Sequence, residues 1–267
     1  MKPSIKGALK RYLPKTVSGL QDLRGILRAS YYRLLPSGNN KYVCPICGYQ
    51  GPFLDHQSKL HSIHFTECPR CGSYERHRLQ YLVMMELNDR YDFSKKSILH
   101  FAPEKSFERV FDRLFAVHHT ADIAAEGVDF KVDICQMPFD DGSYDVIYAS
   151  HVLEHVVNDL EGLAEIRRVL APNGLAILPV PVVSPHTIEY SKPNPQEFGH
   201  VRAIGPDYFE RYKKFCSNVE IWKSTDFDEI HQLFTYENRS NYPSSGSPLR
   251  VPMQGNRHLD YVPVCFR

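Results

Sequence analysis

The sequence predicts an α/β protein with a doubly wound, mostly parallel seven-stranded sheet, preceded by a small cysteine-containing module. Two observations predict this class. From about residue 96 onward, short apolar runs alternate with segments of helical periodicity, which is typical of parallel strands joined by crossover helices. Before that point, two Cys-x-x-Cys pairs lie among polar and turn-forming residues. A chain of 267 residues suits one large domain with a small appendage.

The composition narrows the class of protein. Hydrophobic residues make up 42% of the chain and charged residues 24%, both ordinary for a globular protein. The longest apolar run, Leu175–Val183, is about half the roughly 18 residues that a membrane-spanning helix needs. The N-terminus has no apolar core of the kind found in secretion signals. We therefore expect a cytoplasmic protein whose seven cysteines are thiols or metal ligands rather than disulfides.

Residues 1–42 form a basic leader. They hold nine Lys and Arg against the single acid Asp22, a net charge of +8, whereas the remainder carries −7. Apolar residues recur at helical spacing on both sides of Pro14, which predicts one or two amphipathic helices. Two interpretations stay open. The leader can lie on an anionic surface at the inner face of the membrane, or it can pack on the acidic body.

Residues 43–75 form the cysteine module. Cys44-Pro-Ile-Cys47-Gly recurs as Cys68-Pro-Arg-Cys71-Gly, with 20 residues between the pairs. Two such pairs supply the four thiolates of a closed, tetrahedral zinc-ribbon-like site, so we expect structural Zn²⁺. Iron also suits a tetrahedral sulfur site, and four free buried cysteines are the alternative. Three histidines between the pairs offer replacement ligands, although surface positions suit them better: His56, His61 and His64.

Residues 76–267 contain the predicted sheet domain. The expected strands are Ser97–Pro103, Val117–Ile123, Phe130–Ile134, Tyr144–His151, Gly174–Val182, Asn218–Thr225 and Tyr261–Phe266. The expected helices are Arg76–Asn88, Lys105–Leu114, Val156–Leu170 and Pro206–Phe215. Tyr242–Arg257 is rich in Pro, Ser, Gly and Asn and is predicted to be a loop.

The segment from Phe130 to Pro181 carries a resemblance to a known family. Asp133-Ile134 is followed by Met-Pro-Phe-Asp-Asp-Gly-Ser-Tyr-Asp, then by Val-Ile-Tyr-Ala-Ser-His-Val-Leu-Glu-His, then by Arg-Val-Leu-Ala-Pro-Asn-Gly ending at Gly174. These runs resemble the third, fourth and fifth motifs of class I S-adenosylmethionine-dependent methyltransferases of type 11. The resemblance covers roughly residues 97–267. It implies a Rossmann-like methyltransferase fold, with S-adenosyl-L-methionine as cofactor.

The resemblance also implies a cofactor site at the carboxyl ends of the strands, where such sheets bind ligands. Asp122 matches the acid that holds the ribose hydroxyls, and Asp133 matches the acid that bonds the adenine amine. Ile134 would flank the adenine ring, and Ser150, after the fourth strand, is also expected to bind the cofactor. Each acid has a plainer interpretation as a strand-end cap, because Asp suits turns.

The first motif departs from the family pattern. A glycine-rich turn is usual there, but this strand ends in His100-Phe101-Ala102-Pro103-Glu104. Some family members carry a similar His-x-Ala-Pro-Glu turn. We expect Phe101, Ala102 and Glu104 near the cofactor, with Ala102 small enough for close approach. Glu104 suits either the helix dipole or the cofactor's amino group. Phe101 and Ile134 suit the core better than a contact with the cofactor.

The acceptor side is expected after the fourth and fifth strands. His151 is the best candidate for a general base, and His155 is the second. Further on, His200 and Arg202 are expected to face the cleft, where Arg202 suits an anionic or sugar-rich acceptor. The alternative for Arg202 is a loop held by an Arg–Glu pair.

The function predicted from the sequence is methyl transfer from S-adenosyl-L-methionine to a small-molecule or glycan-type acceptor. Methyltransferases of the cysteine-bearing subgroup resemble accessory enzymes of surface-polysaccharide synthesis. Two alternatives are kept. A nucleic-acid-modifying or nucleic-acid-binding protein is disfavoured, because no basic stripe continues past residue 42. A scaffold that has lost catalysis is the other, because the first motif is poor in glycine.

Overall fold

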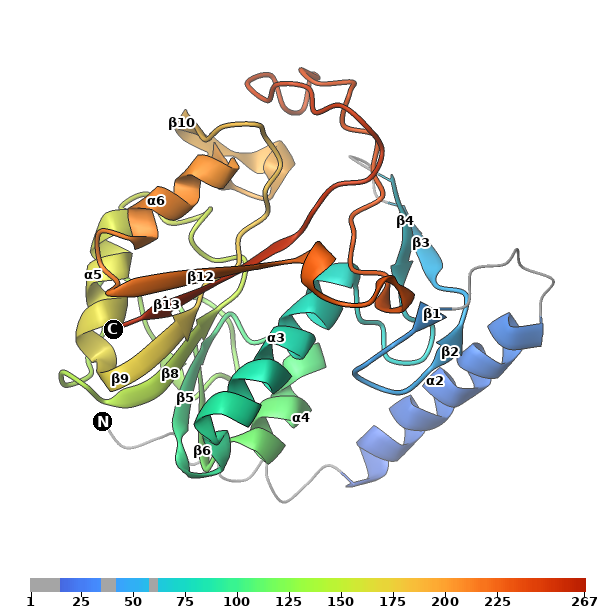
Figure 1. Ribbon diagram of the computed structural model, residues 1–267, viewed down its shortest axis with the longest axis horizontal. Coiled ribbons are helices and arrows are strands. Elements are labelled where there is room, and N and C mark those ends of the chain that lie inside the picture. Colours follow the sequence, from blue (N-terminus) through green and yellow to red (C-terminus); the bar gives the residue numbers. More distant parts are fainter. Residues whose placement is uncertain (1–14, 35–41, 58–61) are drawn as a thin grey trace.

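The computed structural model describes residues 15–34, 42–57 and 62–267 of the chain. The first part of the leader, including Pro14, and His61 lie outside the described residues. Figure 1 shows a central twisted sheet with helices on both faces, and a separate small module beside it. None of the helices in the described ranges has both the length and the apolar character needed to cross a membrane.

The central sheet has seven strands in the order β12-β13-β9-β8-β5-β6-β7. The strands are β5 (Ser97–Phe101), β6 (Val117–Asp122), β7 (Phe130–Lys131), β8 (Tyr144–Ala149), β9 (Leu170–Ile177), β12 (Asn218–Lys223) and β13 (Tyr261–Phe266). Strands β5 to β9 are parallel to one another, and β13 runs antiparallel between β9 and β12. The predicted doubly wound, mostly parallel seven-stranded sheet is confirmed.

The strand order reverses between β5 and β8, which makes the gap beyond their carboxyl ends a topological switch point. From β5 the chain moves outward through β6 and β7, and it returns to the other side of β5 at β8. Ligands of open α/β sheets bind in the crevice at such a point.

Alternating side chains of the strands enter two separate cores. In β5, Ile98 packs on one face of the sheet while Leu99 and Phe101 pack on the other. The first face is covered by α3 (Glu75–Tyr91) and α4 (Lys105–Leu114). The opposite face is covered by α5 (Asp159–Val169) and α6 (Phe209–Tyr212), as Figure 1 shows. This period-two burial on both faces explains why these strands are continuous apolar runs.

Several predicted boundaries differ from the structure. The fifth strand was expected at Gly174–Val182 but is Leu170–Ile177, because it follows α5 without an intervening loop. The helix expected at Val156–Leu170 begins at Asp159, after a turn that follows β8. The helix expected at Pro206–Phe215 is a 3₁₀ turn, Pro206–Tyr208, followed by the single turn of α6. Tyr242–Arg257 contains no helix or strand, as expected.

A hairpin that the sequence analysis did not predict follows β9. Its strands are β10 (Ile188–Asn194) and β11 (His200–Ala203), which pair antiparallel with an irregular register. The chain enters the hairpin close to the carboxyl edge of the sheet, since Val183 and Ser184 donate hydrogen bonds to the Ile204 carbonyl.

The N-terminal module consists of two small hairpins and one helix. The hairpin strands are β1 (Tyr42–Val43), β2 (Gln50–Gly51), β3 (Leu54–Gln57) and β4 (Ser62–Glu67). Helix α2 (Lys15–Leu34) lies along this module in Figure 1, away from the central sheet. Ala29 is buried against the module, and Arg28 forms an ion pair with Glu67 at 2.8 Å.

Arg78 of α3 joins the module to the large domain. Its side chain is fully buried and lies 4.2 Å from the ring of Phe53. The guanidinium donates hydrogen bonds to four backbone carbonyls on three segments, those of Thr66, Ser73, His231 and Gln232. A buried guanidinium whose donors all find acceptors fixes the relative positions of the segments that it bridges.

Candidate functional site

The carboxyl edge of the sheet gathers most of the residues predicted to bind the cofactor. Ala102 follows β5, Asp122 ends β6, Asp133 lies just past β7, and Ser150 and His151 follow β8. Ala102 and His151 both adopt left-handed backbone conformations, with φ of 46° and 54°. Such strain in residues with side chains concentrates at functional sites, and here it flanks the switch point. The glycine that the family pattern has in the first motif is replaced by an alanine in a glycine-like conformation.

Glu104 lies at the start of α4 but its side chain turns toward α3. Its Oε1 accepts hydrogen bonds from Arg76 Nη2 at 3.0 Å and from His77 Nε2 at 2.8 Å. Burial alone raises the pKa of Glu104, but the bonds to His77 and Arg76 outweigh it and hold the pKa well below the usual range. Glu104 makes no side-chain cap to α4. The carboxylate is therefore ionised at neutral pH and pre-positioned.

Several of the buried polar atoms that lack a hydrogen-bond partner in the described part of the chain lie at the carboxyl edge near Glu104. They include Glu104 Oε2, Arg76 Nε, Gln80 Nε2 and Asp260 Oδ2. Gln80 is held in place through its other atom, Oε1, which accepts bonds from Tyr148 and Ser150. Burial raises the pKa of Asp260 to about 6. Unsatisfied buried groups are costly, so a cluster of them indicates a place built for a ligand.

The two acids predicted to bind the nucleoside both brace turns with one oxygen. Asp122 Oδ1 accepts from the backbone N–H groups of Ala124 and Ala125 at 2.8 and 2.7 Å. Asp133 Oδ1 accepts from Cys135 N at 2.9 Å. Among the described residues, the Asp122 Oδ2 has no hydrogen-bond partner, whereas the Cys135 thiol lies beside the Asp133 carboxylate. Asp133 is exposed and Asp122 partly exposed, so both remain accessible.

The apolar candidates belong to the core. Phe101 and Ile134 are about 3% and 5% exposed and lie in the same buried cluster as β8 and α5. Ile134 packs against Gly162 at the start of α5. Ser150 is buried and bonds to Gln80 at 3.3 Å. These three residues support the walls of the site.

The turn after β8 carries the predicted catalytic histidines. The His151 backbone N–H donates to the Pro179 carbonyl at 2.9 Å, and its ring Nδ1 lies 3.3 Å from Oε1 of Glu154. His155 is exposed, and its ring meets that of His200 edge-on, with centroids 4.7 Å apart. Burial lowers the pKa of His200 to about 4, so its imidazole is neutral at physiological pH.

Arg202 holds the same turn from β11 and is not free to face an acceptor. Its guanidinium is about 2% exposed. It donates to the carbonyls of Leu153 and Val156 at 2.6 and 2.7 Å and pairs with Glu189 at 3.0 Å. Arg202 therefore has the second role considered from the sequence, in which its ion pair with a glutamate holds a loop in place. The structure thus brings His151, His155 and His200 together and uses Arg202 to fix them.

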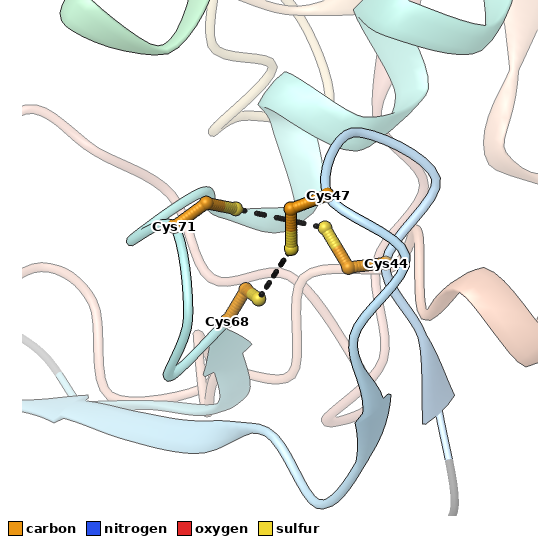
Figure 2. A group of neighbouring side chains, drawn as sticks. All are labelled: Cys44, Cys47, Cys68 and Cys71. Carbon is orange, nitrogen blue, oxygen red and sulfur yellow. Dashed lines mark hydrogen bonds between the residues drawn. The ribbon is translucent and has the colours of Figure 1, made fainter. Parts of the chain in front are cut away.

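The four predicted metal ligands converge, as Figure 2 shows. The Sγ atoms of Cys44 and Cys71 are 3.7 Å apart, and those of Cys47 and Cys68 are 3.6 Å apart. Four sulfurs about 2.3 Å from one tetrahedral ion stand roughly 3.8 Å from each other, so the cluster fits an ion at its centre. Each pair closes the same turn, because Gly48 and Gly72 adopt φ near 71° and 72° and donate to the first cysteine's carbonyl.

The histidines near the cysteines are engaged elsewhere. His64 pairs with Asp55 at 2.8 Å, and His56 contacts Tyr74. The remaining thiols, Cys135, Cys216 and Cys265, lie outside this cluster. The sulfur set is therefore Cys44, Cys47, Cys68 and Cys71 alone, and it can hold a metal.

Sequence reasoning missed the contribution of α3 and of the segment before β13. Arg76, His77 and Gln80 enter the carboxyl edge from the first turns of α3, and Asp260 enters it just before β13. The polar run at the start of the helix, Glu-Arg-His-Arg-Leu-Gln, is the signal that was available. Nothing in the sequence around Asp260 marks it, because its position depends on the antiparallel pairing of a distant strand.

Comparisons with known proteins match part of the sheet domain. Residues 111–178 match a family model described as Methyltransferase domain. The chain is 29% identical over 135 residues to the sterol 4-C-methyltransferase strm-1 of Caenorhabditis elegans, covering 49% of this chain and 40% of that one. It is 41% identical over 58 residues to an uncharacterised 37.1 kDa protein in transposon TN4556 of Streptomyces fradiae, covering 22% and 17%. The matches therefore span less than half of either relative.

Among solved structures, a methyltransferase dependent on S-adenosylmethionine from Archaeoglobus fulgidus is similar at 14% identity. The match covers 70% of this chain and 94% of that one, with a TM-score of 0.42. Residues 111–178, which lie within the seven-stranded sheet domain, therefore match a methyltransferase domain, the class that the sequence resemblance indicated. The four-cysteine cluster stands beside this domain.

Proposed function

We propose that this protein transfers a methyl group from S-adenosyl-L-methionine to a hydroxyl-bearing small-molecule or glycan-type acceptor. The observation that carries the proposal is the cluster of unpartnered buried polar atoms at the switch point of a methyltransferase domain. An amino-acid-like ligand matches this cluster. Glu104 Oε2 offers an acceptor to an ammonium group, and Arg76 and Gln80 offer donors to a carboxylate.

The nucleoside end of the cofactor would lie farther along the edge, over β6 and β7. The Asp122 carboxylate suits the ribose hydroxyls, and the Asp133 carboxylate suits the adenine amine. When bound, the cofactor supplies an electrophilic methyl group on a sulfonium. The protein's part is then to hold the acceptor oxygen against that methyl, which is where most of the rate of such a displacement arises.

His151 is proposed to accept the acceptor's proton, with His155 beside it. Both lie on the turn after β8, and Glu154 stands next to the His151 ring, which suits an imidazole that becomes charged. Extract screening with isotopically labelled cofactor tests the activity, because a true acceptor becomes labelled. Cofactor binding without labelling of any acceptor supports the inactive-scaffold alternative, and labelling of RNA supports the nucleic-acid alternative.

The cysteine cluster is proposed to hold one structural Zn²⁺. Its geometry fits a tetrahedral ion, and it offers no open position for a substrate. We expect one zinc per chain in the purified protein, and none in Cys44→Ser. A folded wild-type protein with four freely titrating thiols and no metal would contradict this assignment.

The exposed face of α2 supports a peripheral membrane role. Four large apolar side chains of this helix are between 46% and 62% exposed: Leu23, Ile26, Leu27 and Tyr31. With the leader's charge of +8, this face matches an anionic lipid surface, where each basic residue contributes about 1 kcal/mol. Co-sedimentation with anionic vesicles, lost in high salt and in Leu23→Glu/Leu27→Glu, is expected. Equal sedimentation of wild type and variant would contradict it.

A further inference from the structure

A second cluster of metal-ligating side chains lies on the acceptor side of the methyltransferase domain. Glu154, His155 and His200 each offer one ligand atom, and these atoms all lie within 4.8 Å of one another. Two of the residues come from the turn after β8, and the third begins β11. The cluster is separate from the four cysteines, which belong to the N-terminal module.

Glu154 carries the first independent sign of a missing partner. Its side chain is about 1% exposed, yet neither carboxylate oxygen has a hydrogen-bond partner in the described part of the chain. His151 Nδ1 stands 3.3 Å from Oε1 without the alignment of a hydrogen bond. A buried carboxylate with neither oxygen bonded is costly, and a cation beside it would offset that cost.

His200 carries the second sign. Its Nδ1 is buried and also lacks a partner among the described residues. Its imidazole stands edge-on to that of His155, so the two rings share one small space above Glu154. Neutral imidazoles are common ligands of transition metals, and two of them with one carboxylate form a recurrent set for such ions.

The backbone holds these three residues in place. Val201 N donates to the Glu154 carbonyl at 2.9 Å, which fixes β11 against the turn. Arg202 donates to the carbonyls on either side, those of Leu153 and Val156. The buried guanidinium thus shapes the turn that presents Glu154 and His155 to His200. Sites with precise metal geometry depend on such support around the ligands.

We propose that Glu154, His155 and His200 bind a divalent transition-metal ion, of the Mn²⁺, Fe²⁺ or Zn²⁺ class, with open positions toward solvent. Three protein ligands leave such an ion free to take oxygen atoms of a second molecule. The three ligands become more exposed toward solvent: Glu154 is buried, His200 is partly buried and His155 is exposed. This inference rests on the proposed function: the open coordination positions of the ion would bind adjacent hydroxyl or carboxylate oxygens of the methyl acceptor.

Titration with Mn²⁺, followed by the electron paramagnetic resonance of the free ion, tests the proposal. Mn²⁺ prefers oxygen and nitrogen to thiolates, and the cysteine site is first filled with a single equivalent of zinc, which the four thiolates take up ahead of the Glu–His–His set, with excess zinc removed. We expect one Mn²⁺ per chain. His155→Ala should weaken binding at least about tenfold, since even partners behind the ligands contribute that much. His186→Ala, at an exposed histidine outside the cluster, is the control and should bind as wild type does.

Melting temperatures, measured with and without Mn²⁺, distinguish loss of metal binding from poor folding of a variant. Without added metal, Glu154→Gln should melt at the same temperature as wild type or higher, because it removes a buried charge. Added Mn²⁺ should raise the melting temperature of wild type but not of Glu154→Gln. Wild type that binds no Mn²⁺ at millimolar concentration, or His155→Ala that binds it equally well, overturns the proposal. These readouts need no cofactor, so they stand apart from failure of methyl transfer.

Discussion

Replacement of Arg78 by methionine should destabilise the whole chain. The side chain is fully buried, and its loss leaves the carbonyls of Thr66, His231 and Gln232 without the donor that they have here. The Ser73 carbonyl loses the same donor but still accepts from the Cys68 N–H. Methionine keeps most of the volume, so the effect isolates hydrogen bonding and charge. Each buried unsatisfied group costs about 1–3 kcal/mol, and partial rehydration of the carbonyls brings the expected total to about 3–5 kcal/mol.

Urea unfolding monitored by circular dichroism measures this loss. Arg90→Met on the same helix is the matched control, because Arg90 is 42% exposed, pairs with Glu220 at 3.2 Å and lies 5.0 Å from the centre of the Trp222 ring. The control should lose less than about 1 kcal/mol. Arg78→Lys should recover part of the stability, since one ammonium cannot reach all four carbonyls. An Arg78→Met protein within 1 kcal/mol of wild type would refute the argument that Arg78 joins module and domain.

Three further outcomes are expected. Asp260→Asn should flatten the stability profile between pH 4 and 6. The pKa of the Asp260 carboxyl is about 6 in the folded protein and 3.8 in the unfolded chain, so the protonated carboxyl stabilises the fold fully below pH 3.8. This stabilisation, up to about 3 kcal/mol of unfolding free energy, is lost as the pH rises through 6. Urea midpoints at several pH values that fall in parallel for wild type and Asp260→Asn would exclude this. Ala102→Gly should stabilise the protein by about 0.5–1 kcal/mol, because glycine adopts the left-handed backbone conformation without the strain of an alanine. The control Ala164→Gly, on the exposed face of α5, should destabilise it by about 1 kcal/mol. Equal losses of stability in thermal unfolding would contradict the strain assigned to Ala102. His151→Ala should lower turnover by about 10²–10⁴-fold while cofactor affinity changes little; an equal fall in both would make it a structural residue.

The sheet could be predicted from sequence because its strands are buried on both faces. Such strands appear as continuous apolar runs, and the helices between them have the 3.6-residue period. Strand ends were less well placed. In β9, Leu170 continues directly from α5, and nothing local separates the helix from the strand.

The cysteine cluster was also predictable, because ligand spacing alone nearly determines it. The acceptor side was predictable only in part. His151, His155 and His200 were chosen as candidates and do come together, but Arg202 was given an acceptor role that its burial does not favour. The unpredicted hairpin β10–β11 explains the difference. Its register decides that His200 faces the turn after β8 while Arg202 reaches beneath it.

The central claim is that the carboxyl edge of the sheet binds S-adenosyl-L-methionine, and calorimetric titration of Asp122→Asn tests it most directly. Asparagine keeps the oxygen that braces Ala124 and Ala125 but removes the charge, so the turn is preserved. Loss of charge-assisted hydrogen bonds, worth about 1.5–3 kcal/mol, should weaken binding roughly 10- to 100-fold. Asp140→Asn, an exposed acid before β8, should bind as wild type does. Wild type that binds no cofactor, or Asp122→Asn that binds it equally well, would contradict the account.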